Sequence, residues 1–360
     1  MEFLYEYGLF LAKTVTFVIA IAAVIGLIVA NSSKGRVGRK GHLELTDLRD
    51  QLDEHQDVIR HQLLSDEELK QLKQEEKKKA KQAKKDAKQK AKEAKKKGAA
   101  EDISEQEVQG RIFVLKFNGS VDAHEVESLR EEVTAILSVA DTDHDEVLLK
   151  LESGGGVVHG YGLAASQLDR IKKAGLTLTV VVDKVAASGG YMMACLADKL
   201  YCAPFAIIGS IGVIAQIPNF HRLLKKHDID FEQVTAGEYK RTLTMFGENT
   251  DQARDKFKNE LNEVHGLFKD FVQRYRPELD LAKVATGEHW FGIQAHELGL
   301  VDELATSDEL LMQHCLDDKE IHEVRYVIRK KLSEKVAENV TSSLARVAAN
   351  WSQKLRYWQQ

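Results

Sequence analysis

From residue 111 onward the sequence alternates between short apolar runs and longer amphipathic stretches, and this alternation constrains the fold more than any other feature. The runs 111–117 (RIFVLKF), 146–151 (EVLLKL) and 176–182 (LTLTVVV) have the length and apolar character of buried strands. Helical patterns separate them, at 123–139 and between the second run and residue 173. These spacings indicate an α/β fold with a mostly parallel sheet covered by helices.

The alternation continues in shorter pieces toward the C-terminus. Short β segments are predicted at 200–203, 207–216 and 230–235. A long amphipathic helix is predicted over 251–275 and ends before Pro277, and shorter helical pieces surround 287–301.

The third strand leads into the stretch VAASGGYMMACLA, residues 185–197, which places Ser188 at a turn of small residues before a buried helix. A hydroxyl at the start of a helix lies close to unpaired N–H groups and to the positive end of the helix dipole, which stabilise a developing oxyanion. Ser188 is therefore a candidate nucleophile. An ordinary helix N-cap is the alternative interpretation of the same residue.

A serine nucleophile needs a base, and the sequence offers two possibilities. None of the 13 histidines is paired with an aspartate in a recognisable order, and the pattern GxSxG is absent because Ala186 stands where it requires glycine. The other possibility is a lysine held neutral by burial, since desolvation lowers a lysine pKa by up to about 3–5 units. Lys240 follows the predicted strand 230–235 and is the candidate. A plain surface lysine beside Arg241 is the alternative.

A second glycine-rich turn, Ser153-Gly154-Gly155-Gly156, follows the second strand. It does not fit the dinucleotide fingerprint GxGxxG, because His159 stands at the position of the third glycine. Such a turn can still offer backbone N–H groups to a phosphate or a carbonyl oxygen.

The N-terminus contains an apolar stretch, residues 9–30, interrupted only by Lys13 and two threonines. As a helix it would span roughly 33 Å, enough for a bilayer core of about 30 Å, so a transmembrane anchor is predicted. A cleaved signal peptide fits less well, because Glu2 and Glu6 stand where a basic leader is expected. The basic residues at 34–40 would hold the C-terminal side in the cytoplasm.

Residues 44–98 consist almost entirely of helix formers with few apolar positions. Between 77 and 97, twelve lysines accompany two acidic residues, a local charge of +10 in a chain whose total is −5. The segment is predicted to be a solvated, helical stalk or spacer. Nucleic-acid binding is not favoured, because the lysine run has no interleaved aromatic residues and the rest of the chain is acidic.

The tail, residues 331–360, is amphipathic, with an apolar face typical of packing against a core or a partner. The three cysteines, Cys195, Cys202 and Cys315, have no metal-ligand spacing, and their odd number gives no disulfide framework. No cofactor and no metal is predicted.

Together these features resemble the signal peptide peptidase A family of serine–lysine membrane peptidases, over about residues 111–302. Four motifs occur in the family's order: the turn at 153–156, ASGGY at 187–191, GSIGV at 209–213 and AHELGLVD at 295–302. Lys240 follows Ser188 by 240 − 188 = 52 positions, which is the family's spacing between nucleophile and base.

The resemblance implies a Clp protease/crotonase-like spiral of βαβ units, preceded by one transmembrane helix and the charged helical stalk. It implies that Ser188 attacks a peptide carbonyl, that Lys240 is the general base, and that Ser210 hydrogen-bonds the lysine amine and orients it. Gly155 and Gly189 would donate backbone N–H groups to the oxyanion.

The resemblance also carries expectations about assembly and location. Gly154 replaces the family's usual proline, which leaves this turn more flexible. Relatives with one such domain form rings, so a homo-oligomer with sites at subunit contacts is expected. The substrates would be hydrophobic peptides or proteins, such as signal-peptide remnants or misfolded segments. The chain would be single-pass in a bacterial inner membrane, with the catalytic domain on the periplasmic side, since long domains are exported regardless of the charge at 34–40.

Four regions are therefore expected: an anchor with its basic flank at 1–40, the stalk at 41–105, a peptidase domain at 106–330 and a C-terminal amphipathic helix at 331–360. Two other functions stay open. A crotonase-like acyl-CoA enzyme on the same fold would need carboxylates, none of which stands at the Ser188 turn. A catalytically idle membrane scaffold would recruit partners through the stalk and the C-terminal helix.

Overall fold

The computed structural model describes residues 5–17, 41–65, 67–71, 74, 78, 81, 110–317 and 319–328. The chain divides into two compact units, one formed by Glu44–Arg325 and the other by Met1–Leu43 with Tyr326–Gln360. In the second unit the backbone N–H of Gly41 donates to the Tyr326 hydroxyl over 2.7 Å. The four regions expected from the sequence stay a prediction.

A sheet of ten strands organises the described part of the chain, in the order β1-β10-β2-β3-β4-β6-β9, with β5 pairing β3 and β7, and β7 pairing β8. The recorded pairs from β10 to β9 are parallel, and β7–β8 is antiparallel. The strands are β1 (His42–Asp47), β2 (Arg111–Gly119), β3 (Glu146–Ser153), β4 (Thr177–Val182), β5 (Val185–Ala187), β6 (Lys199–Cys202), β7 (Ile207–Gly209), β8 (His289–Phe291), β9 (Glu303–Leu304) and β10 (Glu320–Val327).

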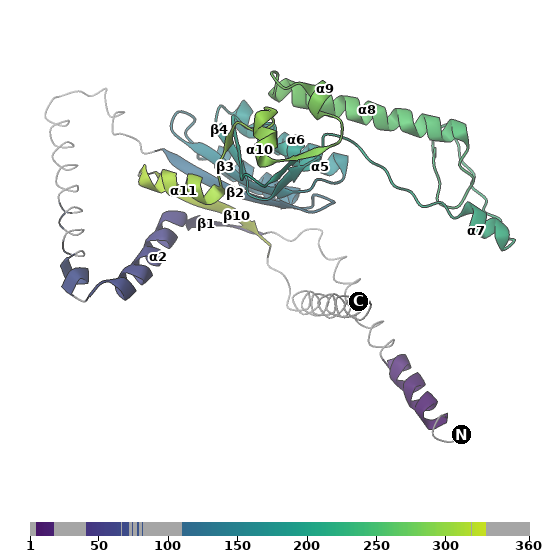
Figure 1. The fold of residues 1–360 in the computed structure, drawn as a ribbon, viewed down its shortest axis with the longest axis horizontal. Coiled ribbons are helices and arrows are strands. Elements are labelled where there is room, and N and C mark those ends of the chain that lie inside the picture. Colours follow the sequence, from purple (N-terminus) through teal and green to yellow (C-terminus); the bar gives the residue numbers. More distant parts are fainter. Residues whose placement is uncertain are drawn as a thin grey trace. The chain divides into compact units, whose positions relative to one another are not determined.

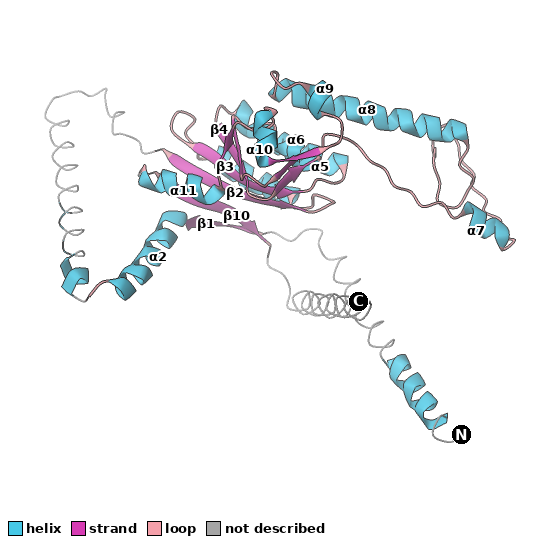
Figure 2. Ribbon diagram, in the orientation of Figure 1, coloured by secondary structure: helices cyan, strands magenta, loops and turns pink. Residues whose placement is uncertain are grey.

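Helices connect the strands, as Figures 1 and 2 show. They are α2 (Leu48–Leu63), α4 (Val126–Leu137), α5 (Val158–Lys173), α6 (Gly189–Ala194), α7 (His221–Lys226), α8 (Asp251–Tyr275), α9 (Leu281–Val284), α10 (Gly292–Glu297) and α11 (Ser307–Leu316). The predicted α/β class with a largely parallel sheet is confirmed, and this arrangement fits a Clp protease-like fold.

Side chains alternate between the two faces along each strand, and in β2, β3 and β4 both faces are largely buried. Phe113 and Leu115 of β2 lie in the larger core with Leu168 of α5. Ile112 and Val114 point to the other face and form a smaller core, against which Leu310 of α11 packs. Strands covered in this way read as continuous apolar runs, which is why the three predicted runs are confirmed as β2, β3 and β4. The helix predicted over 251–275 is confirmed as α8.

Three local predictions are wrong. Residues 230–235 form no strand, and Val234 is 97% exposed with no neighbouring strand to cover it. The β segment expected over 207–216 ends at Gly209, because positive φ angles at Gly209 and Ser210, 99° and 51°, turn the chain out of the sheet. Residues 42–47 form β1 instead of the start of a helical stalk, and Asp47 then caps α2 by accepting the Arg49 N–H over 2.8 Å.

Residues 5–17 of the N-terminal segment form a helix, and residues 18–30 of the predicted anchor lie outside the described residues. None of the helices in the described ranges is both long enough and apolar enough to cross a membrane. Most of the lysine run and the whole tail 331–360 also lie outside the described residues.

Candidate active site

Ser188 stands at the sharp turn between β5 and α6, with φ 52° and ψ −119°. A positive φ is unfavourable for a residue with a side chain and costs on the order of 1–3 kcal/mol. The turn is held by two backbone bonds: the Ser188 N–H donates to the Gly209 carbonyl over 2.8 Å, and the Ser188 carbonyl accepts the Met192 N–H over 2.9 Å. The half-buried side chain makes no capping bond, so the N-cap interpretation of its hydroxyl is wrong.

Gly189 and Gly190 let α6 approach its neighbours closely. A Cβ on Gly189 would collide with the Tyr161 ring, and a Cβ on Gly190 would collide with the Ser153 carbonyl. The pair of glycines after Ser188 is therefore a packing requirement as well as a source of backbone N–H groups.

The second glycine-rich turn lies against the first. Gly155 has φ 83°, and a Cβ there would lie 2.8 Å from the Ser188 Cβ and 2.6 Å from the Gly189 nitrogen. The structure therefore brings Gly155, Ser188 and Gly189 together. The Gly155 N–H, however, donates to Ser153 Oγ over 3.1 Å. To serve an oxyanion as well, this N–H must share its proton between two acceptors or exchange the bond.

Ser210 lies beside Ser188. The parallel register of β5 and β7 pairs Ala187 with Gly209, so the next residue of each strand, Ser188 and Ser210, leaves the sheet at the same edge. This is the carboxyl edge of the parallel strands, where α/β proteins place their sites. Ser210 also has a positive φ of 51°, and its N–H donates to the Glu288 carbonyl over 2.7 Å.

Lys240 does not share this environment. It lies on an exposed loop between α7 and α8, where its backbone N–H donates to the Gly237 carbonyl over 3.2 Å. Figure 1 shows α7 separated by loops from the end of α8 and far from the sheet, whereas α6 lies at the sheet. No hydrogen bond joins Lys240 to Ser188 or Ser210 among the described residues. The burial expected for this amine is therefore not found in the single chain, where no described element covers the loop.

The segment 211–250, which carries Lys240, exposes an unusual number of large apolar side chains. They are Ile214, Ile217, Phe220, Leu223, Ile229, Phe231, Val234, Tyr239, Met245 and Phe246. Three of the rings also cluster: Phe246 stacks on Phe220 at 6.1 Å and contacts Phe231 at 5.7 Å. Exposed apolar surface of this extent is typical of sites that bind another macromolecule.

The sequence did not reveal the roles of two buried polar residues, Ser153 in the second turn and Tyr161 behind it. Ser153 and Tyr161 are 2% and 0% exposed, and their hydroxyl oxygens lie 2.5 Å apart. The available signal was a hydroxyl side chain among small residues, which a single sequence does not distinguish from ordinary packing.

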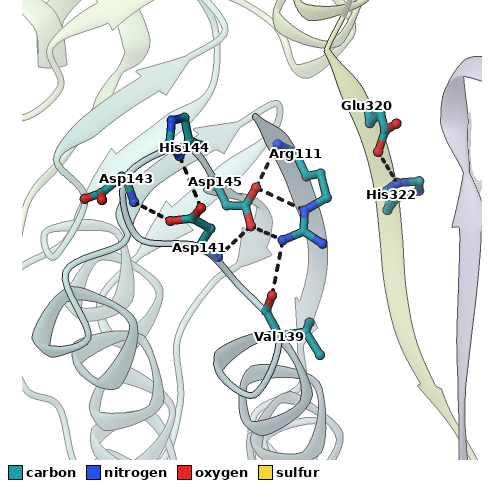
Figure 3. A network of polar contacts seen from close by, with 8 residues as sticks. All are labelled: Arg111, Val139, Asp141, Asp143, His144, Asp145, Glu320 and His322. Atoms are coloured by element: carbon teal, nitrogen blue, oxygen red, sulfur yellow. Dashed lines mark hydrogen bonds and ion pairs between the residues drawn. The ribbon is translucent and has the colours of Figure 1, made fainter. Parts of the chain in front are cut away.

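A cluster of acidic residues lies at the other end of the strands and is already paired, as Figure 3 shows. Asp145 accepts from the Arg111 side chain at 2.6 Å and 3.1 Å, and from the Asp141 N–H at 2.8 Å. Burial opposes its ionisation, but these bonds hold the pKa of Asp145 below its ordinary value. Asp141 in turn accepts the Asp143 N–H over 3.1 Å. No trio of potential ligands is arranged for a metal ion within the described ranges.

The sequence is similar to known peptidases. Residues 2–168 match the model for the N-terminal part of peptidase family S49, and residues 170–319 match that for peptidase family S49. "Probable protease SohB" of Haemophilus influenzae is 50% identical over 353 residues, which cover 98% of this chain and 97% of that protein. "Probable protease SohB" of Buchnera aphidicola (subsp. Acyrthosiphon pisum) is 58% identical over 235 residues, 65% of this chain and 69% of that protein. "Protease 4" of Haemophilus influenzae is 26% identical over 209 residues, 56% of this chain and 34% of that protein.

Proposed function

Because the chain belongs to peptidase family S49, we propose that it is a serine endopeptidase in which Ser188 is the nucleophile and Lys240 the general base. The observation that carries the proposal is the strained Ser188 turn. A residue that bears a side chain is held at positive φ, its hydroxyl is not used for capping, and two glycine turns and a second serine adjoin it. Backbone strain of this kind persists only where the surroundings enforce it, and it is typical of functional sites.

In the proposed reaction, Ser188 Oγ attacks the scissile carbonyl while its proton passes to the uncharged Lys240 amine. The oxyanion that forms accepts hydrogen bonds from backbone N–H groups, for which Gly189 and Gly155 are the proposed donors. Lys240 then protonates the leaving amine, and water, deprotonated by the same lysine, hydrolyses the ester on Ser188. Ser210 would hydrogen-bond the lysine amine and fix its direction.

The exposed position of Lys240 sets a condition on this mechanism. A charged, hydrated ammonium cannot accept a proton, and desolvation favours the neutral amine. We therefore propose that the chain works as a homo-oligomer and that the segment 211–250 of one copy is covered by another. Its exposed apolar side chains support such a contact.

The proposal extends to a substrate class and a cellular location. Hydrophobic peptides, such as signal-peptide remnants or misfolded segments, are the proposed substrates. The apolar composition of residues 9–30 supports a single-pass anchor in a bacterial inner membrane. The catalytic domain would then lie on the periplasmic side.

One alternative has an observation in its favour. A catalytically idle scaffold would need neither a buried lysine nor a free oxyanion donor, and in a single chain Lys240 is exposed and the Gly155 N–H is engaged.

The test is covalent labelling of the full-length, detergent-purified chain with a fluorophosphonate, together with hydrolysis of an apolar fluorogenic peptide. The peptidase proposal expects both to be lost in Ser188→Ala and kept in the control Ser166→Ala, which removes an exposed hydroxyl on α5. A wild-type chain that is neither labelled nor active as an assembled oligomer would favour the scaffold.

A further inference from the structure

A directional chain of hydrogen bonds runs behind the two glycine turns. The Tyr161 hydroxyl lies 2.8 Å from the Ser120 carbonyl, which can only accept, so the single phenolic proton points there. Ser153 Oγ, 2.5 Å from the Tyr161 oxygen, must then donate to it. The Gly155 N–H in turn donates to Ser153 Oγ over 3.1 Å. Each hydroxyl both accepts and donates, and the chain ends on a backbone carbonyl.

The same tyrosine contacts both turns of the candidate site. Its ring occupies the space beside Gly189 where a Cβ would collide, and its hydroxyl reaches the turn of Gly155 through Ser153. Gly155 in turn packs against Ser188. Burial raises the pKa of Tyr161, which keeps its hydroxyl a proton donor.

We infer that Tyr161 is a positioning residue which, through Ser153, sets the distance between the Gly155 turn and the nucleophile Ser188. This rests on the proposed peptidase function. The phenol touches neither the substrate nor the reacting atoms. It fixes the turn that borders them, and a displacement of about 1 Å at such a place costs on the order of 10²-fold in rate.

Tyr161→Phe removes one oxygen and keeps the ring against Gly189. The matched control is Tyr275→Phe, which also removes a partly buried phenol, bonded to Asp169 over 2.8 Å, where α8 meets α5. Ser153→Ala breaks the same chain at its next member. If Tyr161→Phe does not fold, Ser153→Ala carries the test alone.

We expect Tyr161→Phe and Ser153→Ala each to lower kcat by about 10–100-fold with KM changed less than about threefold, and the fluorophosphonate labelling rate to fall with kcat. The double variant should lose no more than either single one, because both break one unit. Tyr275→Phe should keep kcat within about twofold.

Any of three results would overturn the inference. The first is a Tyr161→Phe chain as active as Tyr275→Phe, the second is a loss confined to KM, and the third is that the effects of Tyr161→Phe and Ser153→Ala add up in the double variant. Ser188→Ala separates this failure from failure of the function itself. If Ser188→Ala is inactive while Tyr161→Phe is unimpaired, only the positioning role is wrong. If Ser188→Ala keeps its activity, the proposed function is wrong.

Discussion

The backbone N–H of Ser188 donates to the carbonyl of Gly209 over 2.8 Å, across the end of two parallel strands. The bond ties the turn after β5 to the turn after β7, and at both turns the next residue has a positive φ, 52° at Ser188 and 51° at Ser210. The two serines therefore leave the sheet in the same way and side by side.

Relieving the strain at Ser188 should stabilise the fold while abolishing activity. Glycine adopts φ 52° without a steric penalty, whereas alanine keeps the penalty. In urea titrations we expect the free energy of unfolding of Ser188→Gly to be about 1 kcal/mol higher than that of Ser188→Ala. Both variants should be inactive. Equal stability of the two variants would show that the turn stores no strain.

Gly189 should not tolerate any side chain. An added Cβ would run into the Tyr161 ring, so Gly189→Ala should lower the free energy of unfolding by about 1–3 kcal/mol and reduce activity. Gly154→Ala is the matched control, because a Cβ on Gly154 meets no atom within 4 Å. A thermal or urea unfolding series that ranks the two variants equally would contradict the packing described for α6.

The Arg111–Asp145 pair should contribute stability that depends on pH. The folded state holds the pKa of Asp145 below its ordinary value, so the contribution is fully present above the unfolded value of about 3.9 and is lost as the pH falls through the folded pKa. We expect Asp145→Asn to cost about 2–3 kcal/mol at pH 7, because the Arg111 guanidinium loses its buried partner.

Urea titrations at pH 7 and at pH 3 measure this dependence. The difference between wild type and Asp145→Asn should shrink at the lower pH. A difference that stays constant would mean that the carboxylate charge contributes nothing to the stability of the folded chain.

Much of the fold follows from local pattern, because β2, β3 and β4 are buried on both faces and their apolar runs need no knowledge of their partners. The edge of the sheet is different. β10 was not predicted, and its place depends on pairing Glu320 with Arg111, residues that are distant in the sequence. The strand expected at 230–235 failed for the complementary reason, since no strand among the described residues pairs with it.

The same distinction between local pattern and tertiary context applies to the candidate site. The turn at Ser188 and the turn at 153–156 could be predicted, because small residues at strand ends must turn and pack closely. The roles of Ser153 and Tyr161 could not, because they depend on a hydrogen-bond chain that only the folded backbone assembles. Lys240 was expected to be buried, and in the single chain it is exposed.

No other basic residue should be able to replace Lys240. Arginine stays charged at any accessible pH and cannot accept the serine proton, so Lys240→Arg and Lys240→Ala should both lower kcat by about 10²–10⁴-fold. Lys258→Ala, which removes an exposed lysine from α8, is the control. Peptide hydrolysis by the full-length chain measures the effect, and an active Lys240→Arg chain would rule out the lysine as base.

The most direct test of the account is complementation between two inactive chains, full-length Ser188→Ala and full-length Lys240→Ala, carrying different tags and allowed to exchange subunits in detergent. If a second copy supplies Lys240 to Ser188, random mixing of equal amounts should restore about a quarter of the wild-type peptidase activity, because about one contact in four then joins an intact serine to an intact lysine. Mixed oligomers that co-purify through both tags and yet hydrolyse no peptide would contradict the proposal that the two residues meet between subunits.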